Sequence, residues 1–274
     1  MYARALLPTD GSELARTVLE PLRGFLREGA AITLLTVVET EADAPAAEDS
    51  LESLRPELEA EGYEVHLRSA SGAPGPAILS ALRGGEFDLL AMTSHGRTGL
   101  RRIFAGSVTE EVMRESPTPL LVTTPRTQVR PRNGRLLACL DGSSRATELL
   151  PLVSSLAGQR ADGHVVLLEV ETFYSPEGTK LKLRSSAEVA RELAPHAREL
   201  NDAGVGTSIR VEVGDPAGRI LRAADEEDVD AIVLCTHGRR GLLRFWTGSV
   251  AETVLREGTR PLLVLRSKQG PSGR

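Results

Sequence analysis

The chain has 274 residues, a formal net charge of −5 and only 3% aromatic residues. This acidic balance argues against duplex binding, which needs a basic face, and the few aromatics argue against a base-stacking platform for single strands. Two cysteines are too few for a disulfide framework or a four-cysteine zinc site, and at about 150 residues per domain the length predicts two domains.

Lysine is nearly absent from the chain. It occurs only at Lys180, Lys182 and Lys268, so the first 179 residues contain none. A Walker A loop and a kinase-type strand lysine are therefore excluded from the first half. Any phosphate recognised there must be bound by backbone N–H groups, hydroxyl groups or arginine.

The chain repeats itself. Residues 88–122 align with residues 230–264 at a constant offset of 142, with about half of the positions identical. Asp10-Gly11-Ser12 matches Asp141-Gly142-Ser143 at an offset of 131, so the second copy carries an insertion of 11 residues. A repeat of this length is a duplicated domain and not a solenoid unit.

The two predicted domains are residues 1–125 and 135–268, joined by a linker rich in Pro, Arg and Thr. In each copy, apolar runs typical of buried strands alternate with helical spacing. In copy one we expect strands at Arg4–Pro8, Ala31–Val38, Tyr63–Ser69, Phe87–Thr93 and Pro119–Thr123, and helices at Ser12–Glu28 (kinked or interrupted by Pro21), Asp49–Glu61, from Pro74, and Ser107–Arg114.

In copy two we expect strands at Arg135–Leu140, Gly163–Val170, Val205–Val213, Asp230–Cys235 and Pro261–Leu265, a helix from Pro216, and a helix lengthened by the insertion over about Pro176–Ala203. Alternation of this kind indicates the α/β class. We predict two tandem Rossmann-like domains, each a five-stranded parallel doubly wound sheet with the order 3-2-1-4-5.

Ligands of such sheets bind beyond the C-terminal ends of the strands, where the strand order reverses between strands one and four. In copy one the loops at this point are residues 8–12 and residues 94–107. In copy two the matching loops are residues 141–143 and 237–249. The copies agree best in these loops, which indicates a site or a shared structural need.

The residues of the second loop suit a phosphate. Gly96 lets a ligand approach the backbone, and Gly106-Ser107 opens a helix whose unpaired N–H groups and dipole favour an anion. Arg97 and Arg102 add positive charge.

Simpler roles explain several of the same residues. Ser107 and Ser249 each begin a capping box, and the two roles of a serine hydroxyl are compatible. Asp10 and Asp141 are also explained by Asx-turns before a helix. His95 and His237 have no second ligand at metal spacing, so we predict no metal site.

These loops resemble those of the universal stress protein family. The resemblance rests on Pro8-Thr9-Asp10-Gly-Ser and on Ser94-His95-Gly96, nine residues, then Gly106-Ser107-Val108, and it covers nearly the whole chain as two tandem domains. ATP-binding members of that family carry G-x-x-G, nine residues, then G-[S/T]. The second and third glycines fall on Gly96 and Gly106 and on Gly238 and Gly248, whereas Thr93 and Cys235 replace the first, where a Cβ would crowd the ribose.

The resemblance implies that ATP or a related nucleotide is the ligand, with Mg²⁺ held through its phosphates. It also implies that the first-loop aspartate lies beside the nucleotide and that strand-two backbone, at Val38 or Val170, faces the base. The expected nucleotide-binding residues are Pro8, Thr9, Asp10, Val38, Thr93, His95, Gly96, Arg97, Gly106, Ser107 and Val108 in copy one, and Asp141, Val170, Cys235, His237, Gly238, Arg239, Gly248, Ser249 and Val250 in copy two.

The favoured function is a nucleotide-binding regulatory or stress-response protein. Two alternatives stay open: a nucleotide-free member acting through dimerisation and partner binding, and a slow ATP hydrolase or phosphotransferase. No base, nucleophile or metal constellation supports the enzyme beyond His95 and Asp10, which have no assigned role. We expect a cytoplasmic protein, because residues 1–10 contain no signal-peptide core and no apolar run approaches the ~20 residues of a membrane span.

Cys139 and Cys235 end two strands that are neighbours in the predicted sheet of copy two. We expect them to be buried small apolar side chains. The alternative is a redox-sensitive pair beside the second site, which requires both thiols on one face of the sheet and Cα atoms within about 7 Å.

Strand five of each copy is apolar and is expected at a sheet edge, where an uncovered strand promotes aggregation. We predict that the two copies cover these edges by pairing through strand five as an intrachain pseudo-dimer. The family resemblance implies the same, since single-domain members dimerise through that strand, and it leaves room for a homodimer of whole chains.

If this pairing is correct, each half expressed alone must cover its strand five in another way. We expect the separate halves to dimerise or to aggregate, as measured by size-exclusion chromatography with light scattering. Halves that stay monomeric, folded and in solution would contradict the predicted pairing.

Overall fold

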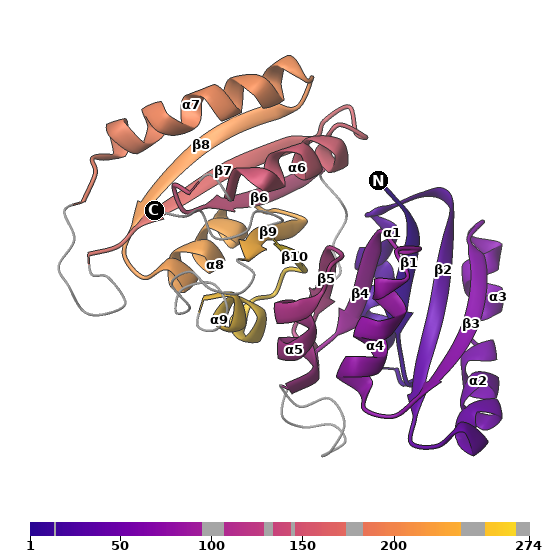
Figure 1. Ribbon diagram of the computed structural model, residues 1–274. Helices are drawn as coiled ribbons and strands as arrows, with labels where there is room; N and C mark the ends of the chain where they lie inside the picture. The colour runs from indigo at the N-terminus through magenta and orange to yellow at the C-terminus, as the bar shows by residue number, and fades with distance from the viewer. Residues whose placement is uncertain are drawn as a thin grey trace. The chain divides into compact units, whose positions relative to one another are not determined.

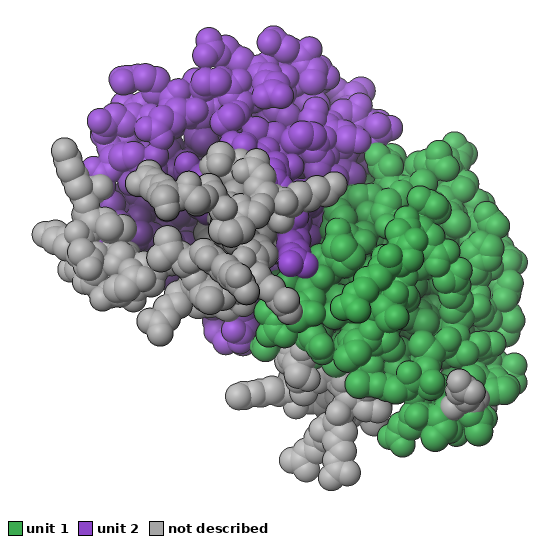
Figure 2. Space-filling model, in the orientation of Figure 1, with its two compact units in different colours: residues 1–129 green, residues 130–274 purple. Residues whose placement is uncertain are grey.

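The computed structural model describes residues 1–13, 15–94, 107–128, 134–143, 146–173, 183–236 and 250–266. The chain divides into two compact units, residues 1–129 and 130–274 (Figure 2), which correspond to copy one and copy two of the repeat.

Copy one contains a parallel sheet in the order β3-β2-β1-β4-β5. Its strands are β1 (Tyr2–Pro8), β2 (Leu26–Val38), β3 (Glu64–Ser71), β4 (Leu89–Thr93) and β5 (Leu120–Thr123). Its helices are η1 (Ala15–Val18), α1 (Leu19–Arg23), η2 (Glu41–Asp43), α2 (Ala44–Glu52), α3 (Arg55–Ala60), α4 (Pro74–Arg83) and α5 (Ser107–Glu115). Helices α2 and α3 pack on β2 and β3, and α4 lies beside α5 on the other side of the sheet (Figure 1).

Copy two has the same topology, with the order β8-β7-β6-β9-β10. Its strands are β6 (Arg135–Leu140), β7 (His164–Glu171), β8 (Gly206–Val213), β9 (Ala231–Thr236) and β10 (Leu262–Arg266). Its helices are η3 (Ala146–Leu149), α6 (Leu150–Ala157), α7 (Ser186–Asp202), α8 (Pro216–Glu226) and α9 (Val250–Glu257). Read in chain order, both sheets are 3-2-1-4-5, so the predicted fold class is confirmed.

The central strands are buried on both faces. Consecutive residues such as Leu89 and Leu90 in β4, and Leu167 and Leu168 in β7, are all fully buried. Because successive side chains of a strand point to opposite faces, such runs require helices on both sides. The continuous apolar runs in the sequence therefore mark these strands reliably.

The helix predicted over Ser12–Glu28 is wrong in its extent. The segment forms the short η1 and α1, which end at Arg23, and β2 already begins at Leu26. Pro21 lies in the first turn of α1, where a missing N–H costs no helical hydrogen bond. The apolar residues after Gly24 belong to the sheet, although their spacing also fits a helical face.

Two further helices differ from expectation. The segment Asp49–Glu61 is divided between α2 and α3, with Pro56 near the start of the second helix. The helix expected from about Pro176 begins instead at Ser186, because Ser185 forms a capping box with Glu188: its Oγ accepts the Glu188 N–H at 3.2 Å. Pro176 lies outside the described residues.

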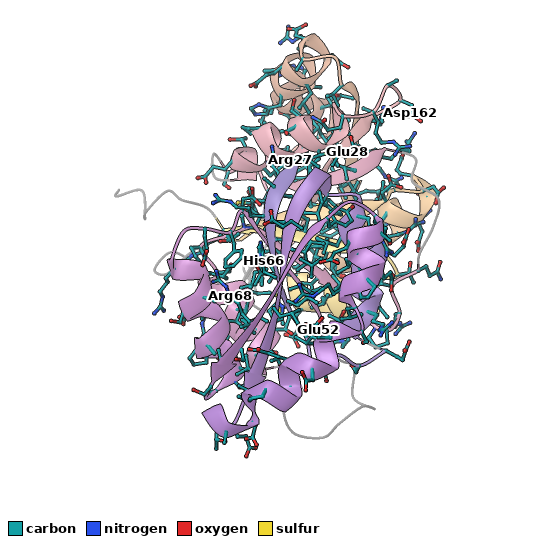
Figure 3. The ribbon with its side chains drawn as sticks, turned by 90° about the vertical axis from the view of Figure 1, so that its right-hand side faces the viewer. Arg27, Glu28, Glu52, His66, Arg68 and Asp162 are labelled. Carbon is teal, nitrogen blue, oxygen red and sulfur yellow. The ribbon has the colours of Figure 1, made fainter. Side chains whose placement is uncertain are left out.

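The edge strand β3 carries charge on its exposed positions. Glu64, His66 and Arg68 are exposed and alternate along β3, and His66 and Arg68 are labelled in Figure 3. Arg68 donates to Glu86 at 2.7 Å and lies over the Phe87 ring at 5.6 Å. Charged side chains on an edge strand discourage pairing with another sheet.

The turn that leads into β7 depends on Gly163. An added Cβ at Gly163 would lie 1.9 Å from the Ala157 carbonyl oxygen, so Gly163→Ala must displace backbone. We expect a loss of about 1–3 kcal/mol in the free energy of unfolding, measured by urea denaturation.

Gly84 provides the matched control, because it has an α-helical φ of −64° and an added Cβ would lie 3.7 Å from the nearest carbonyl oxygen. We expect Gly84→Ala to be neutral or to stabilise by up to about 1 kcal/mol. Equal destabilisation by both substitutions would contradict the steric argument.

Candidate functional site

The first loop of copy one is a tight turn at the point where the strand order reverses. The Gly11 N–H donates to Thr9 Oγ1 at 3.1 Å, and the Ser12 N–H donates to Asp10 Oδ1 at 3.0 Å. Gly11 has a φ of +76°, which favours glycine. The Asx-turn considered for Asp10 is therefore present. The side chain of Asp10 is exposed, so the turn also presents a carboxylate at the end of β1.

The first loop of copy two has the same turn. Asp141 Oδ1 accepts the Ser143 N–H at 3.0 Å and the Ser143 hydroxyl at 2.6 Å, and Gly142 has a φ of +73°. Leu140 stands where copy one has Thr9, so the hydrogen bond from the glycine N–H to Thr9 Oγ1 is specific to copy one. The repeated Asp-Gly-Ser motif is thus explained in part by local turn geometry.

The end of strand two presents backbone groups to this turn. The Thr9 N–H donates to the Leu35 carbonyl at 2.9 Å, and Pro8 with Leu35 is the last β1–β2 pair. Backbone groups alternate in direction along a strand, so the N–H and C=O of Val37 point toward β1 beyond that pair. The Val38 carbonyl points the other way and accepts the Gly72 N–H at 2.9 Å.

The register also relates the two copies. The Glu171 carbonyl accepts the Gly214 N–H at 2.9 Å, as the Val38 carbonyl accepts that of Gly72, so Glu171 is the counterpart of Val38. Val170 is consequently the counterpart of Val37. Val37 was missed by sequence reasoning, because the two adjacent valines of copy one cannot be placed in register without the strand pairing.

Thr93, which replaces the first glycine of the family motif, belongs to a chain of hydroxyl groups. Its Oγ1 lies 3.1 Å from Thr123 Oγ1 on β5 and 3.2 Å from Thr17 Oγ1 on η1. Thr93 is buried and is paired with Thr123 in the strand register. These hydroxyl groups connect the end of β4 to η1 and to β5. The second loop, which is expected to bind phosphate, follows this end of β4.

In copy two the equivalent pair is Cys235 with Leu265. Cys235 and Cys139 are both buried thiols that form no disulfide within the described residues, as expected for small apolar side chains. Burial also raises the pKa of the Cys139 thiol.

The alternative of a redox pair is wrong, because the strand register puts the two thiols on opposite faces. Ala138 pairs with Val233, so these two residues share a face. Cys139 is one residue beyond this pair and Cys235 is two residues beyond it, so their side chains point to opposite faces of the sheet.

The second loop of each copy, residues 95–106 and 237–249, lies outside the residues that the structure describes. The predicted residues concerned are His95, Gly96, Arg97 and Gly106 in copy one and His237, Gly238, Arg239, Gly248 and Ser249 in copy two. Helix α5 begins at Ser107, whose side chain is not described, and α9 begins at Val250. Val108 and Val250 are both buried. The residues that the structure brings together thus come from the first loop and from strands one, two and four.

Copy two contains an ion cluster at this same end of its sheet. Arg184 Nη2 donates to Glu169 and to Glu171, and Arg184 Nη1 donates to Glu192 at 2.5 Å. The backbone N–H of Arg184 also donates to Glu171, at 3.0 Å. A Cβ built on Gly142 would lie 3.1 Å from Glu169 Oε1 and 3.5 Å from Arg184 Nη2. The cluster therefore packs directly against the first loop.

Glu169 is the unusual member of this cluster. Its side chain is only 2% exposed, and its Oε2 atom has no hydrogen-bond partner in the described parts of the chain. Burial raises the pKa of Glu169, although the hydrogen bond from Arg184 opposes the shift. The one sequence signal is a glutamate inside the apolar run of β7, which sequence reasoning overlooked.

The described residues include no cluster of three or more His, Cys, Asp or Glu side chains suited to a metal ion. None of the described helices is long and apolar enough to span a membrane.

Comparison with known proteins identifies relatives for both copies. The model of the universal stress protein family matches residues 1–124 and 132–266. A universal stress protein of Methanocaldococcus jannaschii is 29% identical over 153 residues, covering 44% of this chain and 94% of that protein. One from Mycobacterium bovis is 26% identical over 221 residues, covering 75% of this chain and 74% of that protein.

A solved structure shares the whole fold. The crystal structure of a universal stress protein from Archaeoglobus fulgidus has a TM-score of 0.74 at 23% identity and covers 96% of each chain. The two matches to the family model, which span both copies of the repeat, show that the chain belongs to the universal stress protein family, as a member with two tandem domains.

Proposed function

We propose that the chain is a nucleotide-binding regulatory protein that binds ATP or a related nucleotide at the strand-order reversal of copy one. The observation that carries the proposal is that the Asp10 turn follows β1 directly, while the strand register directs the Val37 backbone toward β1 just beyond the last β1–β2 pair. Both are fixed by hydrogen bonds within the fold, so they are in place before a ligand arrives.

Each of these groups suits one part of a nucleotide. The N–H and C=O of Val37 match the donor and acceptor edges of a base, and the Asp10 carboxylate accepts hydrogen bonds from ribose hydroxyl groups. Helix α5 begins at Ser107, after the loop that follows β4, and the positive end of a helix dipole favours phosphate. Mg²⁺, when bound, would be held through the phosphates.

The phosphate loop gives the first test of the proposal. Gly106→Val adds bulk where the backbone is expected to approach phosphate, so we expect ATP binding in copy one to be abolished in isothermal titration calorimetry. Gly84→Val, on the far end of α4, is the control and is expected to bind ATP like the wild type. Unchanged affinity in a folded Gly106→Val protein would remove this loop from the site.

Ser107 gives a second test, which separates its two roles. As a helix cap alone, Ser107→Ala costs about 1 kcal/mol of stability and leaves affinity unchanged. If the hydroxyl also binds phosphate, the binding free energy falls by a further ~1 kcal/mol, a factor of about five in Kd. Urea denaturation and calorimetry on the same preparation measure the two effects separately, and we expect both.

The same variants distinguish binding from turnover. ATP hydrolysis that persists in Gly106→Val, after binding is lost, comes from a contaminating enzyme. A wild-type protein that binds no nucleotide, and releases none on denaturation by mass spectrometry, would contradict the proposed function and favour a role through dimerisation and partner binding.

A further inference from the structure

The two copies differ most in charge at the place where the first loop meets the end of strand two. In copy two, Glu169 Oε1 and the Arg184 guanidinium both lie against the Gly142 turn, and Arg184 donates hydrogen bonds to Glu169 and Glu171. These side chains come from β7 and from the residue before the α7 cap, so the chain supplies both halves of the ion pair itself.

The counterparts in copy one are uncharged. Register places Thr36 at the position of Glu169 and Val38 at that of Glu171. Thr36 is buried, with an exposure of 6%, and no charge in copy one corresponds to that of buried Glu169. In the first-loop turn of copy one, residues 9–12, Asp10 is the single acidic side chain, and it is exposed.

We propose that Arg184 and Glu169 close the copy-two site to nucleotides, so that each chain binds a single ATP, in copy one. This inference rests on the proposed function, since it assigns that function to one of the two copies. The Arg184 guanidinium occupies the space beside Gly142 that a bound nucleotide would need.

Two physical reasons support this assignment. The first is steric, because a Cβ at Gly142 would lie 3.1 Å from Glu169 Oε1 and 3.5 Å from Arg184 Nη2, so these two side chains occupy space beside the turn that a ribose would need. The second is electrostatic, because one guanidinium faces the three carboxylates of Glu169, Glu171 and Glu192. The cluster therefore carries net negative charge beside the proposed nucleotide position, which disfavours an anionic ligand, whereas the copy-one counterparts of Glu169 and Glu171, Thr36 and Val38, are uncharged.

The ion pair is also held firmly in place. Arg184 donates through Nε, both Nη atoms and its backbone N–H, and Glu171 alone accepts from Nε at 3.2 Å and from the backbone N–H at 3.0 Å. Glu169 is buried and receives its described hydrogen bond from Arg184, so moving Arg184 away would leave a buried carboxylate unpaired. A nucleotide must overcome that loss before it binds.

The test gives copy two the residues of copy one. The triple variant Glu169→Thr/Glu171→Val/Arg184→Ala removes the ion pair as a unit and introduces the residues found at positions 36 and 38. It is made in the Gly106→Val background, where binding by copy one is lost. Titration calorimetry with Mg·ATP then counts the sites per chain, and circular dichroism confirms folding.

We expect one ATP per chain in the wild type, none in Gly106→Val and one in Gly106→Val with the triple change. Addition of Asp141→Ala to that protein should weaken the gained site at least fivefold, which places it in copy two. The control Arg160→Ala/Asp162→Thr removes an ion pair at the start of β7, at the opposite end of the sheet, and should restore no binding.

The outcomes separate the two proposals. Retention of one ATP by Gly106→Val alone, or two ATP in the wild type, would overturn the assignment of Arg184 while the proposed function stands. A folded triple variant that gains no site would overturn it as well. A wild type that binds no ATP overturns the proposed function, and this inference with it. The wild-type and Gly106→Val counts decide the question even where the triple variant fails to fold.

Discussion

The parallel arrangement of the strands determines where chemistry can take place in this protein. Because the strands are parallel, the loops that follow them all lie at one end of the sheet. The loops that follow β1 and β4 leave in opposite directions there, because the strand order reverses between these two strands. β1 ends at Pro8, which pairs with Leu35 of β2, and the backbone of Val37 points toward β1 beyond this last pair. Topology therefore determines the position of the proposed site, and the side chains determine which ligand it can take.

The duplication makes the two copies controls for each other. Some repeated residues serve the fold: Asp88 accepts the backbone N–H groups of Ala3 and Arg4 at 2.9 Å, and Asp230 accepts that of Arg135 at 3.3 Å. These aspartates lie at the N-terminal ends of the strands, away from the proposed site. Identity between copies therefore does not by itself mark a ligand site, and the Asp-Gly-Ser turn has both a structural and a functional reading.

The sequence was sufficient for the sheet and insufficient for its ends. Buried strands are visible in the sequence as apolar runs, and these runs predict the positions of β1 and β6. The end of α1 at Arg23 could not be predicted in this way, because the spacing of Phe25 and Leu26 fits a helical face as well as a strand. The Arg184–Glu169 contact lay beyond prediction, since it joins residues that only the folded chain brings together, and periodicity carries no information about such pairs. The offset between Val37 and Val38 likewise needs the strand register.

The substitutions in copy two gather at one end of its sheet. Thr9 becomes Leu140, Thr36 becomes Glu169, and the hydrogen-bonded pair of Thr93 and Thr123 becomes Cys235 and Leu265. All four replacements remove a hydroxyl group, and the one at position 169 also places a carboxylate in a buried position. A buried carboxylate is tolerated only with a partner, which is the role of Arg184. The changes therefore share one chemistry: copy one has threonines at the ends of these strands, whereas copy two has apolar side chains and a buried carboxylate that accepts a hydrogen bond from Arg184.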